Sequence, residues 1–156
     1  TDDSRTYGYG KSVWAMIDTE TRQPQNILAI RDGEIERYIE KDKECPIEGL
    51  SRVKMGKEAK LARTIDTYYC DVDVNGHINS IKYIEHILDL FDIDHYRKFR
   101  IRRFDIAYVA ESYCGDKLNF YTEERDDDTV CVRVTKTNAE TVDAEVVRCM
   151  LKFEKI

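Results

Sequence analysis

The sequence predicts an α+β domain in which an antiparallel sheet packs against one central helix. A strand at about 61–69 leads into a polar loop, and an amphipathic helix follows over 79–91. The next β-rich segments run in succession, near 99–111, 116–124, 129–137 and 142–154. Strands that follow one another after a single helix favour an antiparallel sheet with that helix on one face.

The predicted helix has one apolar face. Ile81, Ile84, Ile87, Leu88 and Phe91 recur at helical spacing, and the opposite side carries charged and polar residues. We therefore expect those five side chains to face the sheet.

The first 58 residues predict only short elements and a linker. Lys11–Ile17 is apolar enough for a strand, and 18–24 is a turn-rich break. Asp32–Lys41 predicts a short, highly charged helix. Residues 41–58 are charged and hold one proline and two glycines, which is typical of a linker.

The stretch 71–79 combines two carboxylates, two amides and one imidazole. If this run is extended, Asp73, Asn75 and His77 project to one side, because positions two apart share a face of a strand. Asn79 is a suitable N-cap for the helix that follows. The polar side chains then gather at a helix N-terminus, where backbone N–H groups favour negative charge.

Two other interpretations of this stretch use the same residues. Its first eight positions match the start of an EF-hand calcium loop. However, the twelfth position is Lys82 where a bidentate Glu is needed, and the preceding Arg63–Tyr69 predicts a strand in place of the entering helix. A purely structural interpretation is a polar loop that only caps the helix.

The length, charge and composition of the chain limit the classes of protein to which it can belong. The chain has 156 residues, 42% hydrophobic, which fits a folded domain with a sizeable core. A net charge of −6 argues against a general nucleic-acid binder. No run has the length of a membrane span, and no signal peptide is visible. Five cysteines without a CxxC pair or metal spacing suggest reduced thiols, so we expect a cytoplasmic setting.

Four segments resemble one family. Asp71–Ile84 is similar to the Asp-Leu-Asp-Val-Asn-Gln-His-Val-Asn-Asn-Val-Lys-Tyr-Ile signature of plant and bacterial acyl-acyl carrier protein thioesterases. Ser12–Arg22 resembles the last strand and turn of that family's first hot-dog domain, and Gly33–Tyr38 resembles its interdomain linker. Tyr108–Glu111 resembles the family's Tyr-Arg-Arg-Glu.

The resemblance implies a hot-dog fold, which is an antiparallel sheet wrapped around one helix. Residues 1–58 would hold the final strand of a preceding hot-dog domain and a linker helix, and 59–156 would form the thioesterase domain. The implied reaction is hydrolysis of acyl-acyl carrier protein to free fatty acid, with no cofactor and no metal. The site residues it implies are Asp73, Asn75, His77 and Glu111. The residues themselves predict Glu111 near a strand end that faces the polar loop.

Several alternatives stay open at this point. A hot-dog hydrolase of acyl-coenzyme A esters shares a looser form of the motif, and a non-catalytic hot-dog module that binds or assembles is a third possibility. Within the enzymes, Cys70 and Cys114 flank the motif segments and suggest a covalent cysteine mechanism. Direct attack by water activated by Glu111 is the favoured mechanism.

The expected partner is an acyl carrier protein with a phosphopantetheine-linked acyl chain. Such carriers are acidic, so docking needs a local basic surface. The dense basic stretch supplies Arg97, Lys98, Arg100 and Arg102. Because hot-dog domains hide sheet edges by pairing, we also expect a homo-oligomer or a missing N-terminal hot-dog half, with no nucleic acid and no membrane span.

Overall fold

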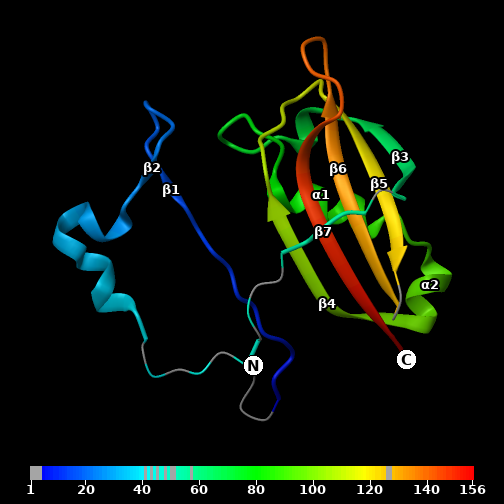
Figure 1. The fold of residues 1–156 in the computed structure, drawn as a ribbon, viewed down its shortest axis with the longest axis horizontal. Helices are drawn as coiled ribbons and strands as arrows, with labels where there is room; N and C mark the ends of the chain where they lie inside the picture. Colours follow the sequence, from blue (N-terminus) through cyan, green and yellow to red (C-terminus); the bar gives the residue numbers. More distant parts are fainter. Residues whose placement is uncertain are drawn as a thin grey trace. The chain divides into compact units, whose positions relative to one another are not determined.

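The computed structural model describes residues 5–40, 42, 44, 46, 47, 49, 52–56, 58–125 and 128–156. The chain divides into two compact units, Thr1–Leu50 and Ser51–Ile156. Figure 1 draws the first unit in blue to cyan and the second in teal to red.

The first unit begins with a short hairpin. Strand β1 (Met16–Ile17) pairs antiparallel with β2 (Pro24–Gln25). The Asp18 carboxylate closes the turn by accepting the backbone N–H of Thr21 at 2.7 Å. The strand predicted over Lys11–Ile17 is therefore confirmed at its last two residues only, and the earlier residues of that run lie outside both strands.

A 3-10 helix, η1 (Ile27–Tyr38), follows the hairpin. Asn26 caps it, but the helical conformation is interrupted at Ile30–Gly33. The helix predicted over Asp32–Lys41 thus begins too early, because Asp32 itself has a positive φ of 52°. Lys41 and several residues of the predicted linker over 41–58 lie outside the described residues.

The second unit is built on a five-stranded antiparallel sheet in the order β3-β5-β6-β7-β4. The strands are β3 (Lys60–Asp66), β4 (Phe99–Tyr108), β5 (Lys117–Arg125), β6 (Thr129–Thr137) and β7 (Ala144–Lys155). The predicted antiparallel pairing is confirmed. β3 and β4 stand at the two edges, and Figure 1 shows the strands twisting around helix α1.

Helix α1 (Ser80–Leu88) supplies the centre of the core. The Asn79 side chain accepts the backbone N–H of Ile81 at 3.0 Å, so the predicted cap is confirmed. Tyr83 and Ile87, one helical turn apart, are buried against the sheet. Their sheet partners include Leu118, Phe120, Val132, Val134, Val147, Cys149, Leu151 and Phe153.

The predicted apolar face of the helix is only partly right. Ile87 is fully buried and Leu88 packs on the core, but Ile81 is 54% exposed. Tyr83, which the apolar count left out, is 3% exposed. The sheet therefore contacts a face rotated toward Tyr83, because a tyrosine ring buries as much area as an aliphatic chain when its hydroxyl finds a partner.

Two short elements were not predicted. η2 (Tyr69–Asp71) ends the run that was expected to be a strand to residue 69. α2 (Ile93–Lys98) lies between α1 and β4, and Asp92 caps it by accepting the N–H of His95 at 2.7 Å. The acidic turn predicted over 126–128 is described only at Asp128.

The segment 52–56 is joined to strand β5 by two hydrogen bonds. The backbone N–H of Gly56 donates to the Glu123 carboxylate, and Arg125 donates to the carbonyl of Lys54. Val53 is buried, with 6% of its surface exposed. Within the described residues, no helix is long and apolar enough to cross a membrane.

Candidate active site

The stretch 71–79 folds as a tight hairpin loop ahead of α1. Val72 and Ile78 form an isolated β-bridge. Inside it, the N–H of Asp73 donates to the carbonyl of His77 at 2.8 Å. Gly76 closes the tip at a φ of +82°, a left-handed conformation that glycine adopts without strain. The extended run predicted from the alternation is therefore wrong.

The loop nevertheless brings the three predicted polar residues together. Oδ1 of Asp73 accepts the backbone N–H groups of Asn75 (2.8 Å) and His77 (3.2 Å). The Asn75 side-chain amide donates to Oδ2 of Asp73 at 3.5 Å. The hydrogen bond from the Asn75 backbone holds the pKa of the Asp73 carboxyl below its ordinary value of 3.8, and that from His77 lowers it further. Val74, in the same loop, is fully exposed.

Glu111 comes from a second loop, which follows β4. The strand was predicted to reach Glu111, but it ends at Tyr108. The Ile78 N–H donates to the carbonyl of Ser112 at 2.8 Å, and this bond joins the two loops directly beside Glu111. Because β4 ends before Glu111, this residue lies in the loop, and its side chain approaches the first loop.

His77 and Glu111 meet where these loops join. Nε2 of His77 lies 3.5 Å from Oε2 of Glu111, with side-chain exposures of 27% and 39%. The Tyr113 hydroxyl donates to the same carboxylate oxygen at 3.3 Å. The Tyr113 ring packs edge-on against the imidazole at 5.2 Å between centroids. The predicted approach of Glu111 to the polar loop is present in the structure.

A buried hydrogen bond ties this junction to the helix. The hydroxyls of Tyr83 and Ser112 are hydrogen-bonded, and the two residues are 3% and 1% exposed. Burial raises the pKa of Tyr83, so its hydroxyl keeps its proton at neutral pH. Helix α1 thus supports both loops, one by direct continuation from Asn79 and the other through Ser112.

Sequence reasoning missed the groups that support Glu111. Lys136 donates from Nζ to the Glu111 carbonyl at 2.8 Å. It continues the buried face of β6 that holds Val132 and Val134. A lysine on an apolar face of a strand is the signal that would have revealed it.

The other motif residues have structural partners. Asp71 is 6% exposed and accepts the N–H of Tyr68 at 2.8 Å, so it holds the turn before the loop. The His86 side chain is 21% exposed and lies edge-on against Phe120. Its Nε2 atom is 3.8 Å from the Asp71 carboxylate.

The structure also argues against the calcium interpretation. Strand β3 precedes the loop where an EF-hand has a helix. The Lys82 ammonium pairs with Glu85 at 2.8 Å on α1. Among the described residues, no group of three His, Cys, Asp or Glu side chains is arranged to hold a metal ion.

The four basic residues predicted to bind the carrier lie on α2 and the edge strand β4. Arg97 pairs with Asp94 at 2.7 Å. Arg100 and Arg102 both approach the Glu154 carboxylate, at 2.5 and 3.6 Å. All four side chains, Lys98 included, are exposed.

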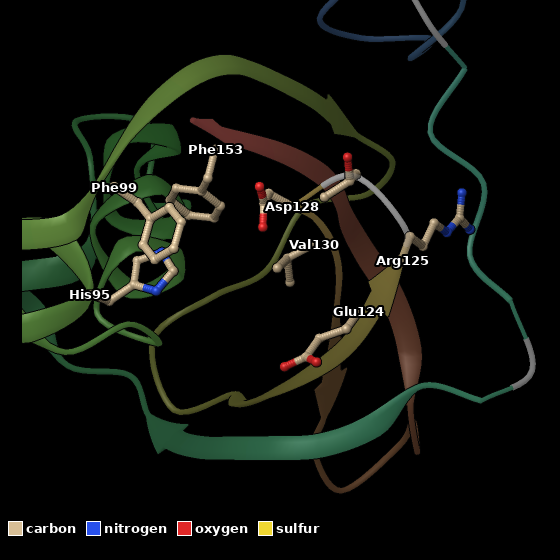
Figure 2. Close-up of a pocket in the computed structure, with 8 residues that line it drawn as sticks. His95, Phe99, Glu124, Arg125, Asp128, Val130 and Phe153 are labelled. Carbon is tan, nitrogen blue, oxygen red and sulfur yellow. The ribbon is translucent and has the colours of Figure 1, made fainter. Parts of the chain in front are cut away.

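A cavity of about 190 Å³ lies elsewhere, between α2 and the ends of β5 and β6. Figure 2 shows His95, Phe99 and Phe153 on one side of it and Glu124 and Asp128 on the other. The His95 ring stacks on Phe99 at 4.9 Å and meets Phe153 edge-on at 4.6 Å. The four predicted catalytic residues do not line this cavity.

The fold and the loop at the helix N-terminus are those of a hot-dog domain. The sequence model of the acyl-ACP thioesterase C-terminal domain matches residues 54–155. The chain therefore belongs to the acyl-ACP thioesterase family.

Similar proteins agree with this assignment. The chain is 30% identical over 107 residues to the chloroplastic palmitoyl-acyl carrier protein thioesterase of Arabidopsis thaliana, which is 67% of this chain and 26% of that protein. It is 45% identical to an acyl-ACP thioesterase from Bacteroides thetaiotaomicron of known structure, with a TM-score of 0.76. That match covers 88% of this chain and 53% of the other.

A second solved structure shares the fold at lower identity. The 12:0-ACP thioesterase from Umbellularia californica is 19% identical, with a TM-score of 0.74, over 90% of this chain and 53% of that one. The chain thus spans about half the length of the two solved relatives.

Proposed function

We propose that this chain forms the second half of a thioesterase that hydrolyses acyl-acyl carrier protein to free fatty acid. The observation that carries the proposal is the contact between His77 and Glu111, 3.5 Å apart at the junction of two hydrogen-bonded loops. Membership of the acyl-ACP thioesterase family supplies the class of substrate. The acyl chain would arrive on the phosphopantetheine arm of the carrier.

In the proposed reaction, the Glu111 carboxylate takes a proton from water as the water oxygen attacks the thioester carbonyl carbon. The carbonyl electron pair moves to oxygen and gives a tetrahedral oxyanion. When the carbonyl re-forms, the carbon–sulfur bond breaks and the thiolate leaves, and the proton held by Glu111 passes to that sulfur or to solvent. A thiol with a pKa of about 8.5 departs with little help from an acid, so the demand falls on activating water and stabilising the oxyanion.

The remaining predicted residues have distinct tasks in this proposal. The Asn75 amide, at the exposed tip of the loop, donates to the oxyanion or holds the attacking water. His77 orients Glu111 or polarises the carbonyl. Asp73 accepts two backbone N–H groups of its own loop and so fixes the positions of Asn75 and His77.

We also propose the domain arrangement that the resemblance implies. Residues 1–58 would be the final strand and linker of a first hot-dog domain, and 59–156 the second domain. The match to about half of each solved relative supports this arrangement. The reaction would take place in the cytoplasm, a setting that suits the free state of the four described cysteines.

The proposed assembly follows from the sheet edges. β3 and β4 are edge strands, and Val74, Ile81 and Val109 are more than half exposed beside the site. We expect these surfaces to be covered by a first hot-dog half or by a second copy. Light scattering of the 156-residue chain at micromolar concentration should give a dimer or larger species, and a strictly monomeric species would contradict the self-association.

The catalytic proposal is tested by Glu111→Gln, assayed in the 156-residue chain and in a protein that carries a first hot-dog half. Gln has the shape of Glu but lacks the base, so kcat for release of fatty acid from acyl carrier protein should fall about 10²–10⁴-fold. The Michaelis constant should change little. The exposed Glu140, in the β6–β7 connection, provides the matched control as Glu140→Gln.

Retained activity in Glu111→Gln would contradict the general-base assignment. Hydrolysis of coenzyme A esters with no activity on carrier-protein esters would instead identify the rival hydrolase. If the wild-type protein with both halves binds acyl carrier protein but releases no fatty acid, a non-catalytic binding role would replace the enzyme.

A further inference from the structure

Lys136 is a nearly buried lysine beneath the candidate site. It stands at the end of β6 and pairs across the sheet with the buried Leu118. Its side chain is only 17% exposed. Its ammonium donates to the Glu111 carbonyl at 2.8 Å. A lysine is rarely this buried unless an opposite charge or hydrogen-bond acceptors compensate the charge of its ammonium group.

Asp116 supplies that compensation. Its Oδ2 atom lies 4.0 Å from the Lys136 ammonium and accepts the backbone N–H of Tyr113 at 2.9 Å. Its Oδ1 atom accepts the side-chain amide of Asn138 at 2.7 Å. Asp116 is 5% exposed, so this pair is shielded from water on both sides. Breaking a buried pair of this kind by removing one partner leaves an uncompensated charge.

The same lysine also contacts the residue that holds the Glu111 carboxylate. The Lys136 ammonium lies 5.4 Å from the centre of the Tyr113 ring, within cation–π range. The Tyr113 hydroxyl donates to Oε2 of Glu111 at 3.3 Å. Lys136 therefore acts on Glu111 at two points, directly at its main-chain carbonyl and through Tyr113 at its carboxylate.

We infer that Lys136 is a positioning residue for Glu111: it fixes the segment 111–113 so that the carboxylate stays against His77. For catalysis, this inference rests on the proposed thioesterase function. The geometric part does not, because the docking of the two loops is a property of the folded chain. Among the described residues, His77, Tyr113 and Lys136 contact Glu111, and Asp116 lies beside the lysine.

The test compares Lys136→Met, which keeps the length of the side chain but removes its charge and donors, with Lys136→Arg, which keeps both. Lys152→Met is the matched control, because Lys152 is an exposed lysine on the neighbouring strand β7. In the protein with both hot-dog halves, kcat of Lys136→Met should fall about 10–100-fold with a nearly unchanged Michaelis constant.

Lys136→Arg should recover most of kcat, and Lys152→Met should match the wild type. A lysine that served only stability would lower the melting temperature while the folded protein kept its kcat. Therefore, an unchanged kcat in a folded Lys136→Met, or a Lys136→Arg that recovers none of the lost kcat, would overturn the inference.

A second measurement needs no catalytic activity. The Ile78 N–H donates to the Ser112 carbonyl, so its hydrogen exchange reports how firmly the two loops are docked. In the 156-residue chain, Lys136→Met should reduce the protection of this amide at least about 10-fold relative to core amides of β6, because about 1.4 kcal/mol of local stability corresponds to tenfold. Lys152→Met should leave it unchanged.

The two measurements separate the failure of this inference from the failure of the proposed function. An inactive wild type whose Ile78 protection is lost in Lys136→Met alone would refute the thioesterase proposal and support the positioning role. Unchanged protection in Lys136→Met would refute the positioning role, whether or not the protein hydrolyses thioesters.

Discussion

Nε2 of His77 lies 3.5 Å from Oε2 of Glu111, and the main chains directly beside them are joined by a 2.8 Å hydrogen bond from Ile78 to Ser112. The backbone therefore sets the separation of the two side chains. A flexible pair on independent loops would sample many separations, and misplacement by about 1 Å can cost two orders of magnitude in rate. The short main-chain link limits that freedom.

The first prediction concerns Asn75. If its amide donates to the oxyanion, Asn75→Ala should lower kcat about 10²–10³-fold, because removing one such donor has an effect of that size. Asn75→Asp is a second test, since Asp has the same shape as Asn but lacks the side-chain N–H donors. The kcat of Asn75→Asp should fall at least as far as that of Asn75→Ala. Steady-state release of fatty acid measures both, and an active Asn75→Asp would contradict the donor role.

The second prediction concerns the exposed cysteines, Cys70 and Cys114. The Cys114 thiol donates to the carbonyl of Thr67 at 4.0 Å. Cys70→Ala and Cys114→Ala should each keep kcat within about twofold of the wild type, as expected for surface substitutions outside the reacting groups. Mass spectrometry after rapid mixing should find no acyl-enzyme, and a trapped acyl-cysteine would restore the nucleophilic mechanism.

The third prediction concerns the basic surface of Arg97, Lys98, Arg100 and Arg102. The double variant Arg100→Gln with Arg102→Gln removes two charges beside Glu154 without placing a carboxylate there. If this surface docks the acidic carrier, the Michaelis constant for acyl carrier protein should rise about tenfold at low salt, and the difference should shrink as salt screens the attraction.

Arg63→Gln supplies the control for this surface, because Arg63 lies on the opposite edge strand, β3, and pairs with Asp89. It should leave the carrier constant unchanged, and coenzyme A esters should be handled alike by all variants. Equal losses on both substrates in the double variant would show that the arginines support the fold and not the carrier.

The fourth prediction concerns acid. The pKa of Asp73 is lowered by the N–H groups of Asn75 and His77, so the folded loop favours the ionised carboxylate. The ionised Asp73 carboxylate therefore stabilises the loop fully above about pH 4, near the ordinary pKa of the carboxyl. This stabilisation is lost as the pH falls through the lowered pKa of the folded state. A carbon-detected NMR titration of Asp73 should give a midpoint below 3.8. The unfolded chain in denaturant is the reference, and an equal midpoint there would contradict the hydrogen bonds.

The elements with strong local signals were predicted well. β6 occupies 129–137 as expected, because its β-branched residues alternate cleanly between turns. The Asn79 cap was also correct, since a side chain that caps a helix acts within two residues. In contrast, α2 was missed. It has six residues, which is too short a run for helical periodicity to emerge.

The sequence predicted which residues come together at the site but not how they are arranged. Alternation placed Asp73, Asn75 and His77 on one face of a strand, whereas a hairpin loop with Gly76 at its tip brings them together. Sequence spacing carries no information on the hydrogen bond between Ile78 and Ser112, because the two loops are distant in the chain. Lys136 was overlooked for the same reason: its partner, the Glu111 carbonyl, is a backbone group that every residue possesses.

The course of residues 52–56 matters to anyone who recombines halves of related thioesterases. Gly56 and Lys54 are hydrogen-bonded to β5, and Val53 is buried, so this short segment is part of the second unit's architecture. A chimera joined after residue 56 would combine Lys54 and Gly56 from one parent with the β5 strand of another. A junction placed before Arg52 would keep those partners together, and it is the natural point for exchanging one second half for another.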